Sequence, residues 1–172
     1  MKTLIVIDMQ NDFIDGALGT TEAQAIVPKV KKKIEEYWER CDQVIFTRDT
    51  HYDNYLRSLE GKHLPIEHCI VNTDGWKITT ELQPYVSKVA TKHTFGCNHW
   101  DIGYYDLKNT ESIELVGLCT DICVVSNALI LKANFPETEI TVDASCCAGT
   151  TPENHKAALQ VMKCCQINVV GE

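Results

Sequence analysis

Two cysteines, Cys119 and Cys123, lie four positions apart in the segment GLCTDICVVSNAL. Such a pair could form half of a metal site or a disulfide, could pack in a core, or could include a nucleophile. A zinc site would need two further ligands, and the other cysteines show no matching pair at metal spacing. The nine cysteines are an odd number without the spacing of a disulfide framework. We therefore expect free thiols in a reducing compartment, most of them packed in the core.

Cys123 differs from the other cysteines in its expected place on a helix. Thr120 and Asp121 are typical of a helix start, and with Thr120 as the N-cap, Cys123 lies in the first helical turn. Unpaired backbone N–H groups and the helix dipole favour a thiolate there, and the same N–H groups could donate to an oxyanion. Cys119 precedes the helix and lacks this activation, so we interpret it as packing or as backbone lining of the site. The pattern favours Cys123 as a nucleophile.

Apolar runs that alternate with helix-like stretches predict how the chain positions its polar residues. Strands are predicted over residues 3–8, 43–47, 87–91, 112–117, 138–142 and 167–170. A helix should begin near Val27, because Pro28 fits only the first turn and apolar residues follow at a period of 3.6. A second helix should start at Thr120 and a third at Thr151, which can cap it ahead of Pro152. The stretch from residue 48 to 75 has no clear period and is predicted as a loop.

This order of elements predicts an α/β protein with a three-layer Rossmann-like fold, in which helices flank a mainly parallel six-stranded sheet. One domain over residues 1–172 is expected from the length. The net charge of −8 lacks the positive field of a protein that binds nucleic acid or an anionic membrane. The apolar run at the N-terminus is too short for a signal peptide or a membrane span, so we expect a cytoplasmic protein. Apolar helix faces allow a homo-oligomer.

Polar residues follow the ends of four predicted strands. Asp8 follows the first strand, Asp49 and His51 the second, Lys92 the third, and the segment with Cys123 the fourth. Each could be ordinary: Asp8 could cap a loop, and Lys92 could be a solvated lysine. In open parallel sheets, however, ligand sites lie beyond the carboxyl ends of the strands, where the strand order reverses. We therefore expect these residues to converge on one crevice.

Several motifs together resemble the cysteine hydrolases of the isochorismatase-like superfamily, and within them the nicotinamidase group. The matching segments are VIDMQNDF, TRDTH, PIEHC, GLCTDICV and VDASCCA, together with Lys92 after the third strand. They occur in the family's order along nearly the whole chain. The combination of DMQNDF with GxxTDxCV is the most specific part of this resemblance.

The resemblance implies a catalytic triad of Asp8, Lys92 and Cys123. It also implies a cis peptide bond between Leu118 and Cys119, and an oxyanion hole formed by the backbone N–H groups of Cys119 and Cys123. In such a site Cys123 would attack a carbonyl carbon, and Asp8 would carry the thiol proton to the leaving amine. Lys92 would favour the ionised partners through its charge.

The resemblance further implies that Asp49, His51 and His68 bind one divalent metal, with zinc, iron and manganese as candidates, and that no organic cofactor is used. Three protein ligands leave open positions for water or for the nitrogen of a pyridine-type ring. Phe13 and Leu64 would line the substrate pocket. Leu64 stands where the nicotinamidase group often has tryptophan, and the segment HTFGCNHW after the third strand also departs from that group.

The leading functional hypothesis is an amidohydrolase that cleaves a small-molecule amide through a cysteine thioester, with nicotinamide converted to nicotinate and ammonia. A carbamoyl or ureido amidohydrolase would keep the thiol and change the substrate. Isochorismatase-type hydrolysis of a vinyl ether needs no cysteine nucleophile, so Cys123 counts against it. A binding module without activity would carry a broken triad, which is not the case here.

Overall fold

The computed structural model describes residues 1–100 and 103–172. Six parallel strands form one sheet in the order β3-β2-β1-β4-β5-β6, which confirms the predicted α/β fold with a parallel sheet. The strands are β1 (Thr3–Ile7), β2 (Gln43–Asp49), β3 (Val89–Lys92), β4 (Ser112–Leu118), β5 (Glu139–Ala148) and β6 (Asn168–Val170). The α-helices are α1 (Asn11–Ile14), α2 (Thr21–Glu39), α3 (Leu59–His63), α4 (Val125–Asn134) and α5 (Pro152–Cys164), and a short π-helix, η5 (Thr120–Val124), precedes α4.

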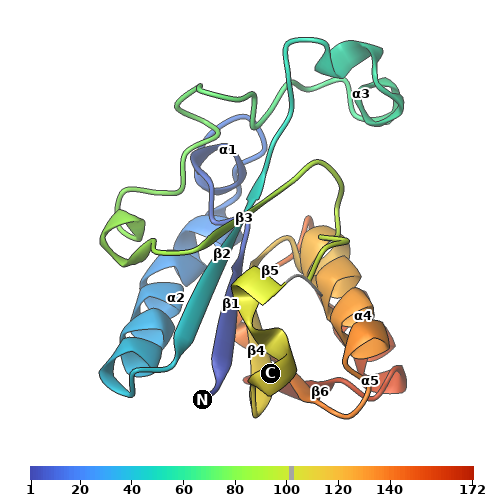
Figure 1. Ribbon diagram of the computed structural model, residues 1–172. Helices are drawn as coiled ribbons and strands as arrows, with labels where there is room; N and C mark the ends of the chain where they lie inside the picture. The colour runs from blue at the N-terminus through green and yellow to red at the C-terminus, as the bar shows by residue number, and fades with distance from the viewer. Residues whose placement is uncertain (101–102) are drawn as a thin grey trace.

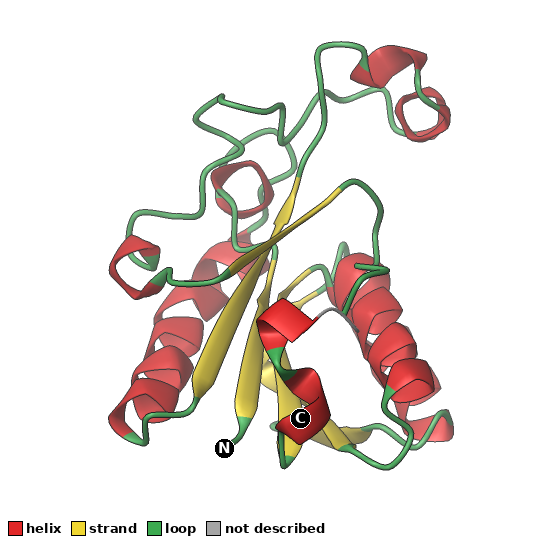
Figure 2. Ribbon diagram, viewed as in Figure 1, coloured by secondary structure: helices red, strands yellow, loops and turns green. Residues whose placement is uncertain are grey.

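Helices cover both faces of the sheet, with α2 on one side and α4 and α5 on the other (Figures 1 and 2). Leu4 and Val6 of β1 pack in the cluster that contains the apolar face of α2. Ile5 and Ile7 pack in the cluster that contains the apolar residues of α4 and α5. Successive side chains of a strand point to opposite faces, so the uninterrupted apolar run of β1 is buried on both sides. Each such side chain contributes roughly 1.5–3 kcal/mol of burial free energy.

The strand order reverses beside β1, and this reversal places the site. The chain runs from β1 outward to β2 and β3, and then crosses to β4 on the other side of β1. Gly117, near the end of β4, has φ +118°, and a Cβ there would lie 2.2 Å from the carbonyl oxygen of Ile7. Glycine is required at this position because it accepts the conformation and lets the two strand ends approach closely. The polar residues that follow β1 and β4 therefore face one crevice.

Helix α2 begins at Thr21, six positions before the predicted start near Val27, so this prediction is wrong. The Oγ1 atom of Thr20 accepts a hydrogen bond from the backbone N–H of Ala23 at 3.0 Å, which caps the helix. Pro28 lies inside the helix, where its missing N–H removes one intrahelical hydrogen bond. Burial of Ala23 and Ile26 against the sheet offsets that loss. The cap and the core contacts outweigh the preference of proline for a first turn.

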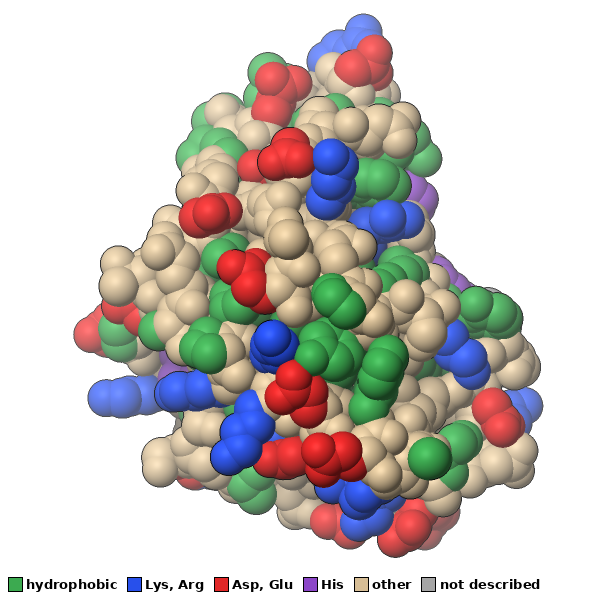
Figure 3. Space-filling model, turned by 90° about the vertical axis from the view of Figure 1, so that its left-hand side faces the viewer, with side chains coloured by type: hydrophobic (Ala, Val, Ile, Leu, Met, Phe, Trp, Pro, Cys, Tyr) green, Lys and Arg blue, Asp and Glu red, His purple; other side chains and the backbone are tan. Residues whose placement is uncertain are grey.

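The surface on the α2 side of the molecule carries interspersed charges of both signs (Figure 3). The basic run KVKKKIEE lies in this helix, and the fully buried residues Val30 and Ile34 alternate there with exposed or half-buried lysines and glutamates. In the described residues, no helix combines the length and the apolar character that crossing a membrane would need.

Candidate active site

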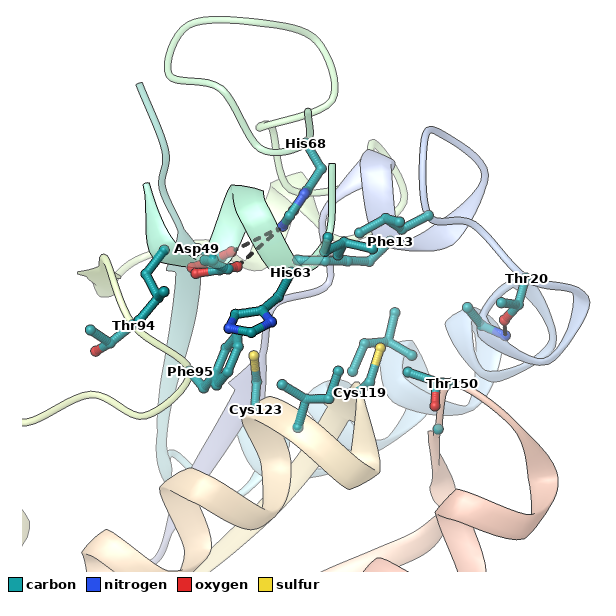
Figure 4. A pocket seen from close by; sticks show the side chains of 18 residues that line it. Phe13, Thr20, Asp49, His63, His68, Thr94, Phe95, Cys119, Cys123 and Thr150 are labelled. Carbon is teal, nitrogen blue, oxygen red and sulfur yellow. Dashed lines mark hydrogen bonds and ion pairs between the residues drawn. The ribbon is translucent and has the colours of Figure 1, made fainter. Parts of the chain in front are cut away.

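A cavity of about 830 Å³ opens at the carboxyl ends of the strands (Figure 4). Its lining includes Asp49 at the end of β2, His68 after α3 and Cys123 in η5. It also includes Phe13 and Leu64, the two residues predicted to line a substrate pocket. The crossing point of the sheet thus brings together residues that lie far apart in the sequence. The convergence expected from the strand ends is present.

Lys92 lies at the centre of a buried polar cluster. Its Nζ atom is 2.6 Å from Oδ2 of Asp8, 3.2 Å from Oδ1 of Asp49 and 3.5 Å from the sulfur of Cys123. Asp8, Lys92 and Cys123 are each at most 5% exposed. The Oγ1 atom of Thr47 donates a hydrogen bond to Oδ1 of Asp8 at 2.6 Å, which fixes the carboxylate. One cation therefore bridges a carboxylate and a thiol inside a site that excludes most water.

The protonation states in this cluster follow from burial and charge. Burial raises the pKa of Asp8, and the Lys92 charge only partly opposes this. Burial also raises the pKa of the Cys123 thiol well above its ordinary value, and the Asp8 charge adds to the effect. Burial lowers the pKa of Lys92, but the charges of Asp8 and Cys123 outweigh it, so this pKa is raised and Lys92 stays a cation. Burial of the sulfur therefore opposes the stabilisation of a thiolate that the helix start provides.

The helix that carries Cys123 begins differently from the prediction. Cys119, and not Thr120, is the N-cap residue, and the first turn is a wide π turn in which the N–H of Val124 donates to the carbonyl oxygen of Cys119 at 3.0 Å. The hydroxyl of Thr120 pairs with Nδ1 of His155 at 2.8 Å and makes no cap hydrogen bond. A contact with α5 therefore replaces the expected cap. Cys123 still lies in the first turn, and the peptide bond between Leu118 and Cys119 is cis.

Asp49, His51 and His68 form a second cluster, in which the candidate ligand atoms all lie within 4.8 Å of one another. The Nδ1 atom of His68 lies 2.8 Å from the carbonyl oxygen of Ile66. As a donor to that oxygen, Nδ1 carries the proton and leaves the lone pair of Nε2 free toward the cluster. The Nε2 atom of His51 is buried and lies 3.0 Å from Oδ2 of Asp49. Two imidazole nitrogens and a carboxylate oxygen form a donor set that fits a divalent metal.

Glu60, which the sequence analysis missed, lies beside this cluster. Its Oε1 atom lies 3.5 Å from Nε2 of His51 and 3.8 Å from Nε2 of His68. It lies in α3, whose N-cap Ser58 accepts a hydrogen bond from the N–H of Gly61 at 2.9 Å. A serine followed two positions later by a glutamate is a signal for a helix start that the interpretation of this stretch as a loop overlooked. Glu60 therefore offers a further oxygen donor.

Gln10 holds the backbone of Asp49 from both sides. Its Oε1 atom accepts from the N–H of Asp49 at 2.7 Å, and its Nε2 atom donates to the carbonyl oxygens of Asp49 and Trp76, each at 2.9 Å. Gln10 is fully buried. A side-chain amide can both accept from an N–H and donate to a C=O. Gln10 therefore anchors the end of β2, next to the possible metal ligands Asp49, His51 and His68. The sequence analysis did not single it out.

The pocket wall combines aromatic and aliphatic side chains. The ring of Phe13 lies beside that of His68, with centroids 5.5 Å apart. His63 and Phe95, both missed by the sequence analysis, lie near the sulfur of Cys123 (Figure 4). Cys119 also lines the cavity, farther from the metal candidate cluster. The cavity therefore offers an apolar surface for a planar ring next to a nucleophile and a set of nitrogen and oxygen donors.

Comparisons with known proteins agree with this geometry. The family model for the isochorismatase domain matches residues 2–171. The chain is similar to a nicotinamidase of Saccharomyces cerevisiae, at 23% identity with 100% of each chain covered. It is also similar to the crystal structure of a pyrazinamidase of Pyrococcus horikoshii in complex with zinc, at 28% identity and a TM-score of 0.84 with 99% of each chain covered. A crystal structure of a nicotinamidase from Bacillus subtilis has 26% identity, a TM-score of 0.83 and 99% coverage of each chain.

Proposed function

Because the chain belongs to the isochorismatase domain family, we propose that it is an amidohydrolase that converts nicotinamide to nicotinate and ammonia. The observation that carries this proposal is the position of Lys92, whose Nζ atom lies 2.6 Å from Asp8 and 3.5 Å from Cys123. The names of the relatives, nicotinamidases and a pyrazinamidase, support an aromatic carboxamide as the substrate.

In the first half of the reaction, Cys123 attacks the carbonyl carbon of the amide and its thiol proton passes to Asp8. Asp8 accepts this proton as the carboxylate partner of Lys92, and burial, which raises the pKa of Asp8, makes it a stronger base than a solvated carboxylate. Asp8 then gives the proton to the amide nitrogen, the C–N bond breaks, and ammonia leaves. The product of this half is a thioester between the acyl group and the sulfur of Cys123.

In the second half, water attacks the thioester and gives its proton to Asp8. The C–S bond breaks, the proton returns to the sulfur of Cys123, and the carboxylic acid is released. Lys92 remains a cation throughout and stabilises negative charge on either Asp8 or the sulfur. The backbone N–H groups of Cys119 and Cys123 stabilise the oxyanion of each tetrahedral intermediate.

Asp49, His51 and His68 would hold a divalent metal, with Glu60 as a further donor. When bound, such a metal supplies a Lewis acid that can bind the ring nitrogen of a pyridine. The ion pair between Lys92 and Asp49, at 3.2 Å, joins this cluster to the nucleophile cluster. Asp49 therefore positions both groups of residues relative to one another. Zinc is the preferred candidate because a similar pyrazinamidase was solved with zinc, and iron and manganese are the alternatives.

We also propose that the chain works as a homo-oligomer in the cytoplasm. The exposed apolar side chains of Trp38 on α2 and Val161 on α5 support an oligomer. All nine cysteines are free thiols, which supports a reducing compartment. Light scattering of the purified protein tests whether it is a homo-oligomer, and a molar mass of one chain would contradict that proposal.

Ammonia release from a panel of amides tests the proposed function. The panel contains nicotinamide, pyrazinamide, an aliphatic amide and a ureido compound, each assayed with and without added zinc. We expect nicotinamide and pyrazinamide to be hydrolysed at least about tenfold faster, in kcat/KM, than the other two. Turnover of the ureido compound alone would contradict the proposal and would point to a carbamoyl amidohydrolase.

A further inference from the structure

Asn127 on α4 uses all of its hydrogen-bonding capacity inside the protein. Its Oδ1 atom accepts from the backbone N–H of Cys97 at 2.9 Å and from the indole N–H of Trp100 at 3.0 Å. Its Nδ2 atom donates to the carbonyl oxygen of Cys123 at 2.7 Å and to that of Phe95 at 3.2 Å. Two donors face one end of the amide and two acceptors face the other, so its orientation is fixed by its partners. The side chain is fully buried.

These four hydrogen bonds join two parts of the proposed active site. One partner is the backbone of Cys123, the proposed nucleophile, one helical turn before Asn127. The others belong to the wall segment, residues 93–100, which starts directly after Lys92 and reads HTFGCNHW. Phe95 of this segment lines the cavity near Cys123, although its side chain is 47% exposed (Figure 4). An exposed aromatic ring needs its backbone to be held if it is to keep one position over a cavity.

Gly96 shows how closely the wall segment rests on α4. A Cβ at Gly96 would lie 2.3 Å from the Cδ1 atom of Ile130 and 3.4 Å from the Cβ atom of Ser126. The segment therefore packs against α4 at a residue without a side chain, which lies between the two residues whose backbone groups bond to Asn127. The close approach and the amide hydrogen bonds fix the same stretch of backbone independently.

From this arrangement we infer that Asn127 is a positioning residue, which holds Phe95 beside the nucleophile and so determines how well an aromatic acyl group fits. Neither aspartate nor leucine can replace the amide. Aspartate lacks the N–H donors for the carbonyls of Cys123 and Phe95, and leucine would leave all four partners unpaired. This inference rests on the proposed function, because it concerns the ring-binding part of the same site.

A double-mutant cycle in KM tests the inference, with Phe95→Ala, Asn127→Ala and the double variant. The substrate is nicotinamide, or the best amide of the panel if that is a different one, so a failed substrate assignment remains distinct from a failed inference. We expect Phe95→Ala to raise KM about tenfold with kcat within about threefold, since it removes a ring contact from a bound planar substrate. Asn127→Ala should raise KM by a similar factor. The double variant should then exceed Phe95→Ala by less than about threefold, because Asn127 acts through Phe95.

Two further variants keep the test decisive. Asn134→Ala, an exposed asparagine of the same helix, is the matched control and should leave KM unchanged. Asn127→Asp keeps the size of the side chain and removes the N–H donors to the carbonyl oxygens of Cys123 and Phe95, so it should also raise KM and tests the same hydrogen bonds if Asn127→Ala does not fold. KM effects of Phe95→Ala and Asn127→Ala that multiply in the double variant would overturn the inference. So would a folded Asn127→Asp variant with the KM of the unmodified protein.

Discussion

The ammonium group of Lys92 lies 2.6 Å from Oδ2 of Asp8, and both side chains are almost completely buried. A buried ion pair loses the hydration of both groups, and removal of one partner leaves an uncompensated charge. Such a pair is costly to keep for stability alone. Its position beside the sulfur of Cys123 explains why the fold places these two residues at the ends of β1 and β3.

Asp8 and Lys92 should act as one unit with Cys123. We expect Asp8→Asn and Lys92→Met each to lower kcat by about a thousandfold, because each removes one part of a single proton-transfer device. The double variant should lose scarcely more than either single variant. Steady-state kinetics at saturating nicotinamide provide the measurement. Losses that multiply in the double variant would argue that the two residues act separately.

Removal of a metal ligand should separate ring binding from thiol chemistry. We expect His51→Ala to lose bound metal and to lower kcat/KM for nicotinamide at least about a hundredfold. The rate at which iodoacetamide alkylates Cys123 should stay within about threefold, because the sulfur is adjacent to Lys92 and not to His51. Elemental analysis and a timed alkylation followed by mass spectrometry provide the two readouts. A protein that keeps full activity in a chelator, with under about a tenth of a metal ion per chain, would contradict the metal site.

Glu60 should contribute to metal affinity. We expect Glu60→Gln to weaken zinc binding about tenfold in a competition titration, since an uncharged amide is a poorer donor than a carboxylate. Glu67→Gln changes an exposed glutamate of the segment that follows α3 and is the matched control. Equal zinc affinities of the two variants would show that Glu60 is not a ligand.

Stability should depend on pH through a carboxylate of β5 that forms an ion pair with α2. Lys33 Nζ lies 2.9 Å from carboxylate oxygens of both Glu114 and Asp143. Burial raises the pKa of Asp143, but hydrogen bonds from Ser145 and Lys33 and the Lys33 charge outweigh it, so this pKa is lowered. A lowered pKa contributes stability that is present above the unfolded value of about 3.9 and is lost as the pH falls through the folded value.

We therefore expect Asp143→Asn to lower Tm at pH 7 and to approach the Tm of the unmodified protein in acid, below about pH 3. Thermal unfolding followed by circular dichroism across this range provides the measurement. Asp53→Asn, at an exposed aspartate, is the control and should show a Tm difference that does not vary with pH. A Tm difference between Asp143→Asn and the unmodified protein that grows as the pH falls would contradict this prediction.

The sequence was sufficient to predict the parallel sheet and the convergence of the polar residues at the ends of its strands. The apolar runs of β1 and β4 are buried on both faces, so composition alone identified them, and their ends located Asp8 and Cys123. The start of α2 was misplaced because Pro28 is a strong local signal, whereas the burial that tolerates it depends on contacts distant in sequence. The roles of Glu60, Gln10 and Asn127 arise from hydrogen bonds and contacts across distant loops, which have no period in the sequence.

The state of the thiol could not be derived from the sequence either. The position of Cys123 in a first helical turn suggested a lowered pKa, but burial of the sulfur depends on the surrounding side chains and has the opposite effect. Desolvation of a charge in a closed site exceeds the contribution of one helix end. The position of Cys123 along the helix indicated that this residue could react. The protonation state of its thiol depends on the side chains that bury it in the folded protein.

Mass spectrometry of protein quenched with acid during turnover of nicotinamide tests the central claim most directly. We expect a nicotinoyl adduct whose fragment ions place it on Cys123 and not on Cys119. The adduct should persist in Cys119→Ala and disappear, together with ammonia release, in Cys123→Ala. An adduct on a different residue, or continued ammonia release by Cys123→Ala, would contradict a cysteine thioester at this site.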